Sequence, residues 1–123
     1  MVRLFSCLAS LVLLTVLLCG SATAAGEYNY CSKVFGDFLP CISYVGGLSN
    51  QDPTGKCCQG IRKLNGRAKQ NGEAPKKICQ CIEDMTYVMN LAFVSSQVAS
   101  LQDKCNLNLS FPISNAMDCS KVG

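Results

Sequence analysis

The chain is 123 residues long, with 49% hydrophobic residues, 15% charged residues and a formal net charge of +3. So small an excess of positive charge gives no reason to expect a nucleic-acid partner. Histidine, the usual general base for a serine or cysteine nucleophile, is absent, and no cysteines have the two-residue spacing typical of zinc sites. We therefore expect no enzyme activity, no metal and no cofactor.

Residues 1–24 have the three parts of a secretory signal peptide. A positive start at Arg3 precedes an almost wholly apolar run over residues 4–19, and residues 22–24 form a small-x-small cleavage site. The apolar run is shorter than the roughly 20 residues that span a bilayer, and an uncleaved membrane anchor is the alternative interpretation. We predict cleavage after Ala24 and release of residues 25–123 as one small soluble domain.

Cysteine is the most informative residue type in this sequence. Ten cysteines are present, and cleavage would remove Cys7 and Cys19, which leaves eight. An even number in a short secreted chain indicates a disulfide framework. Four of the eight form two tight pairs, Cys57-Cys58 and Cys79-Gln80-Cys81, and neighbouring cysteines cannot easily bond to each other. On a helix, Cys79 and Cys81 would project about 200° apart, so that helix would be held from two sides.

Two amphipathic helices are predicted before residue 72. The first covers residues 28–45 with a kink near Pro40, and Gly46-Gly47 ends it. The second begins at Asp52-Pro53, which supplies an N-cap residue and a first-turn proline, and it ends at Asn71-Gly72.

Two further helices are predicted before Cys105. One begins near Ala74-Pro75 and breaks at Asn90, and a short one follows with Val94, Val98 and Leu101 on its apolar side. The sequence thus predicts an all-α domain of four short helices stapled by four disulfides. Four bridges either offset an interior that is not filled or protect against proteases and heat outside the cell, and the composition does not separate these hypotheses.

The last nineteen residues, 105–123, lose the helical period. Apolar side chains alternate at Leu107, Leu109, Phe111 and Ile113, which indicates a strand. No second strand is visible to pair with it, so an extended tail that lies over the helices fits the pattern equally well.

The cysteine order is Cys31-x9-Cys41-x15-Cys57-Cys58-x20-Cys79-x-Cys81-x23-Cys105-x13-Cys119. It resembles the eight-cysteine pattern of the plant non-specific lipid-transfer proteins, with spacings similar to the type 1 group. Amylase/trypsin inhibitors and storage albumins share the spacing loosely, but local segments are similar to the lipid-transfer family. These segments are 40–44, 57–65, 99–101 with 104–105, 113–114 and 118–122.

The resemblance implies a four-helix bundle with a long apolar tunnel under the C-terminal tail. It implies a monomer of the plant cell wall that binds fatty acids, acyl-CoA or lysophospholipids and moves lipids between membranes, with roles in wall-lipid delivery or defence. It also implies four pairings, chosen from the resemblance among the 105 that eight cysteines allow. They are Cys31–Cys81, Cys41–Cys57, Cys58–Cys105 and Cys79–Cys119.

The apolar residues at helical and alternating positions are the candidate tunnel lining. Spacing alone favours an ordinary core, whereas the resemblance favours a wall that binds acyl chains by apolar burial, worth about 0.8 kcal/mol per methylene. The candidates are Val34, Phe38, Ile42, Val45, Ile61, Leu64, Ala68, Ile82, Met85, Met89, Leu101, Leu109, Phe111 and Ile113.

Two polar positions of the family are not matched. The family's Arg before the fifth cysteine is absent, and Lys76 is the candidate substitute. We predict Arg62 and Lys76 near the lipid head group. Phe111 stands where the family has Tyr and lacks the hydroxyl. We therefore expect a tunnel that holds acyl chains but orients the head group less tightly.

Seven of the ten basic residues expected in the mature chain lie between Lys56 and Lys77, and they form either a solvated face or a surface that contacts an anionic membrane. Asn108-Leu109-Ser110 is a glycosylation sequon. The rival function is protease or α-amylase inhibition, for which the 46–56 loop with Lys56 is the candidate. A storage role is weaker, since the chain is not rich in Gln.

Overall fold

The computed structural model describes residues 29–122, and its compact C-terminal unit begins at Cys31. The predicted signal peptide, with Cys7 and Cys19, lies outside the described residues. Within them the protein is helical and contains no strand, which confirms the all-α prediction. No helix in this part of the chain combines the length and the apolar character needed to cross a membrane.

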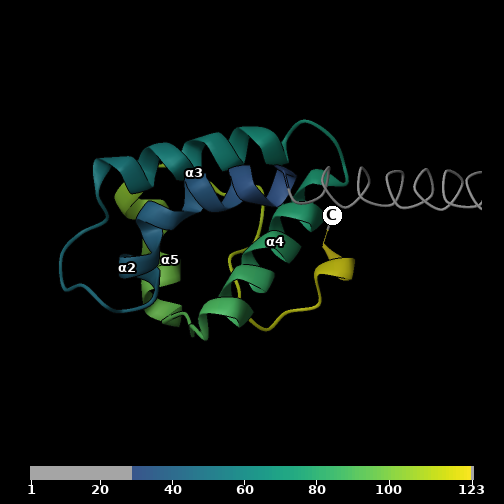
Figure 1. The fold of residues 1–123 in the computed structure, drawn as a ribbon. Helices are drawn as coiled ribbons and strands as arrows, with labels where there is room; N and C mark the ends of the chain where they lie inside the picture. The colour runs from purple at the N-terminus through teal and green to yellow at the C-terminus, as the bar shows by residue number, and fades with distance from the viewer. Residues whose placement is uncertain (1–28, 123) are drawn as a thin grey trace, which may run out of the picture. The chain divides into compact units, whose positions relative to one another are not determined.

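Within residues 29–122, four longer helices and three short helical turns make up the fold (Figure 1). In chain order they are a helix over residues 29–38, η1 (Leu39–Cys41), α2 (Ile42–Val45), α3 (Gly55–Ala68), α4 (Ala74–Met89), α5 (Ser95–Cys105) and η2 (Cys119–Lys121). The tail after α5 runs back across the helices and ends beside α4.

The predicted helix breaks at Pro40 and Asn90 are confirmed. Pro40 lies in the 3-10 turn η1 between the first helix and α2, because its ring prevents a continuous α-helix. Asn90 caps α4 in the left-handed conformation with φ 52°, and its backbone N–H donates to the last turn.

The predicted start of α3 is wrong by two residues. The N-cap is Thr54 rather than Asp52, since the Thr54 hydroxyl accepts a hydrogen bond from the Cys57 N–H at 3.1 Å. Asp52 instead forms an exposed ion pair with Lys104 near the end of α5, and this hydrogen bond raises the pKa of Lys104.

The fourth helix and the tail differ from the prediction in detail. Val94 is not part of α5 but is its N-cap residue in an extended conformation, and its side chain is 40% exposed. Its backbone N–H donates to the Val45 carbonyl at 2.8 Å. The tail is extended but forms no strand, which agrees with the interpretation of an extended segment that lies over the helices. Its alternation nevertheless holds, because Phe111 and Ile113 are buried and Ser110 is exposed.

The four disulfides are Cys31–Cys81, Cys41–Cys57, Cys58–Cys105 and Cys79–Cys119, which confirms the pairing that the family resemblance implied. They hold α4 from two sides, since Cys81 is joined to the first helix and Cys79 to η2. Each long helix is therefore tied to at least one other part of the fold.

Candidate functional site

The helices enclose a continuous set of buried apolar side chains, to which the tail also contributes. Twelve of the fourteen predicted lining residues are buried, with exposures of 8% or less. They are Val34, Phe38, Ile42, Val45, Ile61, Leu64, Ala68, Ile82, Met85, Leu101, Phe111 and Ile113. Leu109 is half-buried and Met89 is 46% exposed.

Met89 is exposed because it occupies the last position of α4, where the chain turns away at Asn90. Helical periodicity places it in line with Ile82 and Met85, but periodicity cannot tell where the neighbouring elements stop covering that face. Met85, one turn earlier, is 5% exposed and remains part of the interior.

Tyr44 and Phe93 also belong to this region and were not predicted from the sequence. Tyr44 is 4% exposed, and its hydroxyl donates to Ser100, whose own hydroxyl donates to the Gln97 carbonyl at 3.1 Å. Phe93 packs against Phe38, with ring centroids 5.8 Å apart at an interplanar angle of 59°. The only signal for them was aromatic character, since neither lies on a predicted apolar stripe.

Asn65 fastens the tail to α3. It is a polar residue with 8% exposure among apolar neighbours, and its side-chain amide donates to the Asn108 carbonyl at 2.8 Å. Its carbonyl oxygen accepts from the Ser110 N–H at 2.6 Å. Gln102 of α5 accepts from the intervening Leu109 N–H at 2.9 Å. We name residues 106–118 the strap, because side chains of α3 and α5 bind its backbone over the apolar interior.

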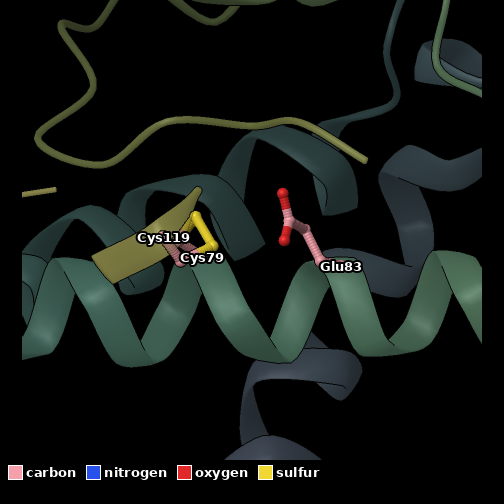
Figure 2. Close-up of side chains that lie close together, drawn as sticks. All are labelled: Cys79, Glu83 and Cys119. Atoms are coloured by element: carbon pink, nitrogen blue, oxygen red, sulfur yellow. A yellow bond between two sulfur atoms is a disulfide. The ribbon is translucent and has the colours of Figure 1, made fainter. Parts of the chain in front are cut away.

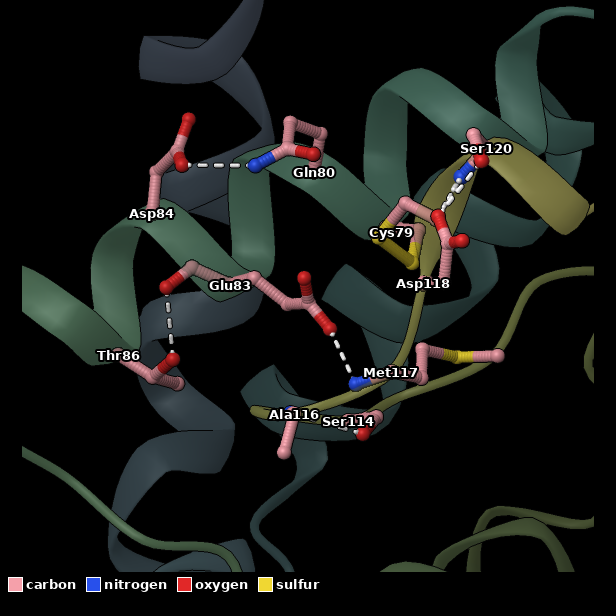
Figure 3. Close-up of a disulfide and its surroundings, with 11 residues drawn as sticks. Cys79, Gln80, Glu83, Asp84, Thr86, Ser114, Ala116, Met117, Asp118 and Ser120 are labelled. Atoms are coloured by element: carbon pink, nitrogen blue, oxygen red, sulfur yellow. Dashed lines mark hydrogen bonds between the residues drawn. A yellow bond between two sulfur atoms is a disulfide. The ribbon is translucent and has the colours of Figure 1, made fainter.

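The far end of the strap is fastened to α4 (Figure 3). The Glu83 carboxylate accepts from the Met117 N–H at 2.8 Å, and the Cys79–Cys119 disulfide follows two residues later. Asp118 caps η2 by accepting from the Ser120 hydroxyl and N–H, and these hydrogen bonds lower the pKa of Asp118 below its usual value.

Cys79, Glu83 and Cys119 lie close enough together to resemble a metal-ligand cluster (Figure 2). The two sulfur atoms are bonded to each other, so neither is a thiolate ligand. The remaining carboxylate of Glu83 already accepts from the Met117 N–H. The group is therefore a structural joint between α4 and the tail.

The predicted head-group residues have structural partners. The Arg62 guanidinium donates to the Cys105 carbonyl at 3.2 Å, at the end of α5. Lys76 lies 3.8 Å from Glu73 in an ion pair one turn along α4. Phe111, in place of the family's Tyr, is 4% exposed and adds to the apolar interior.

The candidate inhibitor residue Lys56 is exposed, but it is the second residue of α3 and not part of an extended loop. Asn108 of the sequon is exposed, and only its backbone carbonyl is bound by Asn65.

Comparison with known proteins places this architecture in a family. A profile described as "Protease inhibitor/seed storage/LTP family" matches residues 31–119. Non-specific lipid-transfer protein 3 of Oryza sativa subsp. indica is 37% identical over 93 residues, which are 75% of this chain and 74% of the rice protein.

Solved structures agree with the sequence comparison. Non-specific lipid transfer protein 1 from barley, in complex with L-α-lysophosphatidylcholine, superposes with a TM-score of 0.62 and 33% identity, covering 76% of this chain and 98% of the barley chain. A lipid transfer protein complexed with palmitate gives a TM-score of 0.58 and 29% identity over 76% and 98% of the two chains. The chain therefore belongs to the protease inhibitor/seed storage/LTP family and, within it, to the non-specific lipid-transfer proteins.

Proposed function

We propose that this protein binds single-chain lipids in the apolar interior beneath the strap and carries them between membranes without breaking bonds. The observation that carries the proposal is the strap itself. It closes an interior lined from every long helix. Between the disulfides at Cys105 and Cys119, the strap is held by hydrogen bonds to Asn65, Gln102 and Glu83 that can open and re-form.

Fatty acids, acyl-CoA and lysophospholipids are the proposed cargo. Related proteins of the same fold hold lysophosphatidylcholine and palmitate, each with one acyl chain. The twelve buried candidate side chains are the proposed wall, and burial of a chain among them would contribute about 0.8 kcal/mol per methylene. We propose no catalytic step, and the protein would act as a monomer.

Release of residues 25–123 into the extracellular space by cleavage after Ala24 is part of the proposal. Its support is the signal-peptide pattern of residues 1–24 and the four disulfides, which are typical of oxidising compartments. N-terminal sequencing of protein secreted by plant cells tests this step and should begin at Ala25. A mature protein that keeps the apolar run would contradict it.

We also propose that the protein discriminates only weakly between lipid head groups. Arg62 and Lys76 are the basic residues offered for the head group, but both already have partners within the protein. We therefore expect lysophospholipid and free fatty acid to bind with affinities closer together than a dedicated head-group site would give. Asn108 is the proposed glycosylation site, supported by its exposed side chain.

Inhibition of a protease or an α-amylase is the second candidate function, and the structure favours it less. A protruding inhibitory loop would have to include Lys56, whereas Lys56 lies in the first turn of α3 beside Cys57.

Titration of the oxidised protein with a fluorescent long-chain fatty acid, followed by displacement with lysophosphatidylcholine, tests the proposed function. We expect saturation near one or two equivalents and loss of binding when the disulfides are reduced. A correctly oxidised protein that binds neither lipid would contradict the proposal, and inhibition assays with a Lys56→Ala control would then test the second candidate.

A further inference from the structure

An uncharged apolar surface lies where the α2–α3 loop meets the α4–α5 connection. Leu48 is 71% exposed, Tyr87 88%, Val88 82% and Val94 40%, and Leu91 is half-buried beside them. We name these five residues the charge-free face. Large apolar side chains that are exposed together, rather than singly, indicate a surface that contacts another apolar phase.

The name reflects the sequence around these residues. No charged residue occurs from 38 to 51 or from 85 to 102, the two stretches that supply the face. A charge that enters the apolar part of a bilayer costs roughly 2.5–3.5 kcal/mol, whereas aromatic Tyr is favoured at the boundary between lipid and water. An uncharged surface with an exposed Tyr therefore matches a lipid surface.

Contacts join the α2–α3 loop to the α4–α5 connection and bring Leu48, Leu91 and Val94 together. Tyr87 and Val88 lie in the last turn of α4, which leads directly into that connection. The Val94 N–H donates to the Val45 carbonyl at 2.8 Å. A β-carbon on Gly47 would lie 2.8 Å from Val94 Cγ2, so a larger residue would require the Val94 side chain to shift, and the φ of +70° at Gly47 is one that glycine tolerates. Side-chain atoms of Leu48 and Leu91 both lie within 3.8 Å of the position that a β-carbon on Gly46 would take.

The face also adjoins the apolar interior. Phe93, between Leu91 and Val94 in sequence, packs on the buried Phe38. A lipid that entered at this face would thus first meet the Phe93 and Phe38 rings.

Charge distribution decides which lipid surface fits. The nearest charges before Tyr87 on α4 are the acidic Glu83 and Asp84, whereas the cluster of basic residues lies between Lys56 and Lys77 on α3 and the start of α4. Acidic neighbours do not favour an anionic membrane, so the charges match a zwitterionic surface.

We propose that the charge-free face is the docking surface through which this protein contacts zwitterionic phospholipid membranes. The proposal rests on the proposed carrier function, but it concerns docking and not the binding of cargo. Docking depends on apolar burial, so it should be insensitive to salt, whereas docking through the basic residues of α3 would weaken as salt screens the charges.

Co-sedimentation with phosphatidylcholine vesicles, alone or with phosphatidylglycerol added, tests this proposal at low and high salt. The test variant is Tyr87→Ser/Val88→Ser, and the matched control is Lys63→Gln/Lys69→Gln, at exposed positions on α3 and its C-cap. We expect the test variant to lose about 10–100-fold in partition onto phosphatidylcholine and the control to lose nothing. Both variants alter exposed side chains, and circular dichroism checks that they fold.

Fatty-acid titration of the same variants separates docking from carriage, because none of the four substituted residues is a proposed lining residue. Normal fatty-acid binding with lost vesicle binding supports the proposal. Vesicle binding that requires phosphatidylglycerol, falls with salt and is lost in the Lys63/Lys69 control overturns it in favour of the basic residues. A dimer that dissociates in the Tyr87/Val88 variant, without vesicle binding, assigns the face to a second copy and also overturns it.

Discussion

Asn65 is the residue on which closure of the strap most depends. Its amide satisfies one backbone acceptor and one backbone donor of the strap, at 2.8 and 2.6 Å, from a buried position on α3. Helical periodicity gave no sign of this role, because a polar residue next to Leu64 fits an exposed position as well as a buried one. The role depends on the backbone of residues 108–110, and the sequence does not show that this segment lies against Asn65.

Replacement of Asn65 with Leu should leave the Asn108 carbonyl and the Ser110 N–H without partners. We expect the free energy of unfolding to fall by about 2 kcal/mol and amide exchange at Ser110 to accelerate. Denaturant titration and hydrogen exchange measure the two effects. The control Asn50→Leu, at an exposed loop position, should stay within about 0.5 kcal/mol of the wild type. Equal losses in the two variants would contradict the assigned role of Asn65.

The lowered pKa of Asp118 predicts how the end of the strap responds to pH. Hydrogen bonds from Ser120 lower the pKa of Asp118 in the folded state, so the ionised form stabilises η2. This stabilisation is complete above the unfolded-state pKa, near about 3.9, and is lost as the pH falls through the lower folded-state pKa.

We therefore expect the amide signal of Ser120 in NMR spectra to stay in its native position when the pH passes 3.9 and to shift only at lower pH. A midpoint at or above the pKa of an ordinary aspartate would show that the Asp118 cap does not form in solution.

At the scale of elements, the first helix and α3 pack with their backbones almost in contact at Gly60. A β-carbon at Gly60 would lie 1.8 Å from the Asp37 carbonyl oxygen, so the backbones would have to move apart. Asp37 also pairs with Arg67 at 3.7 Å, which joins the same two helices through side chains.

Gly60→Ala should destabilise the protein by roughly 3 kcal/mol, at the upper end of the cost of overpacking, because the clashing atom belongs to the backbone. Gly66→Ala is the matched control, since a β-carbon there meets nothing within 4 Å and α3 gains helix propensity worth up to about 1 kcal/mol. Thermal unfolding of the two variants measures the contrast. Similar melting temperatures would contradict the close approach at Gly60.

The sequence predicted element types better than element ends. The positions of proline and asparagine in the sequence predicted the helix breaks at Pro40 and Asn90, because these residues act through local backbone geometry. The start of α3 was misplaced because Asp52-Pro53 and Thr54 are both adequate starting signals. In the structure Thr54 accepts from the Cys57 N–H, whereas Asp52 pairs with Lys104, which is distant in sequence.

At the scale of the whole molecule, periodicity and alternation predicted most of the interior, including the buried Phe111 and Ile113 of an unpaired tail. The disulfide pairing came from family resemblance, since spacing alone leaves every pairing open. The strap fastenings and the charge-free face were beyond prediction, because each joins loops and side chains that only the folded chain brings together.

The central claim is that the buried apolar set opens to enclose an acyl chain rather than packing permanently on itself. NMR of protein with isotope-labelled Ile, Leu and Val methyl groups, saturated with palmitate, tests it directly through contacts between lipid and methyl protons. The account predicts contacts from the acyl methylenes to Ile61, Ile82 and Ile113. Contacts confined to exposed methyl groups such as those of Leu48 and Val88, with the interior signals unchanged, would contradict it.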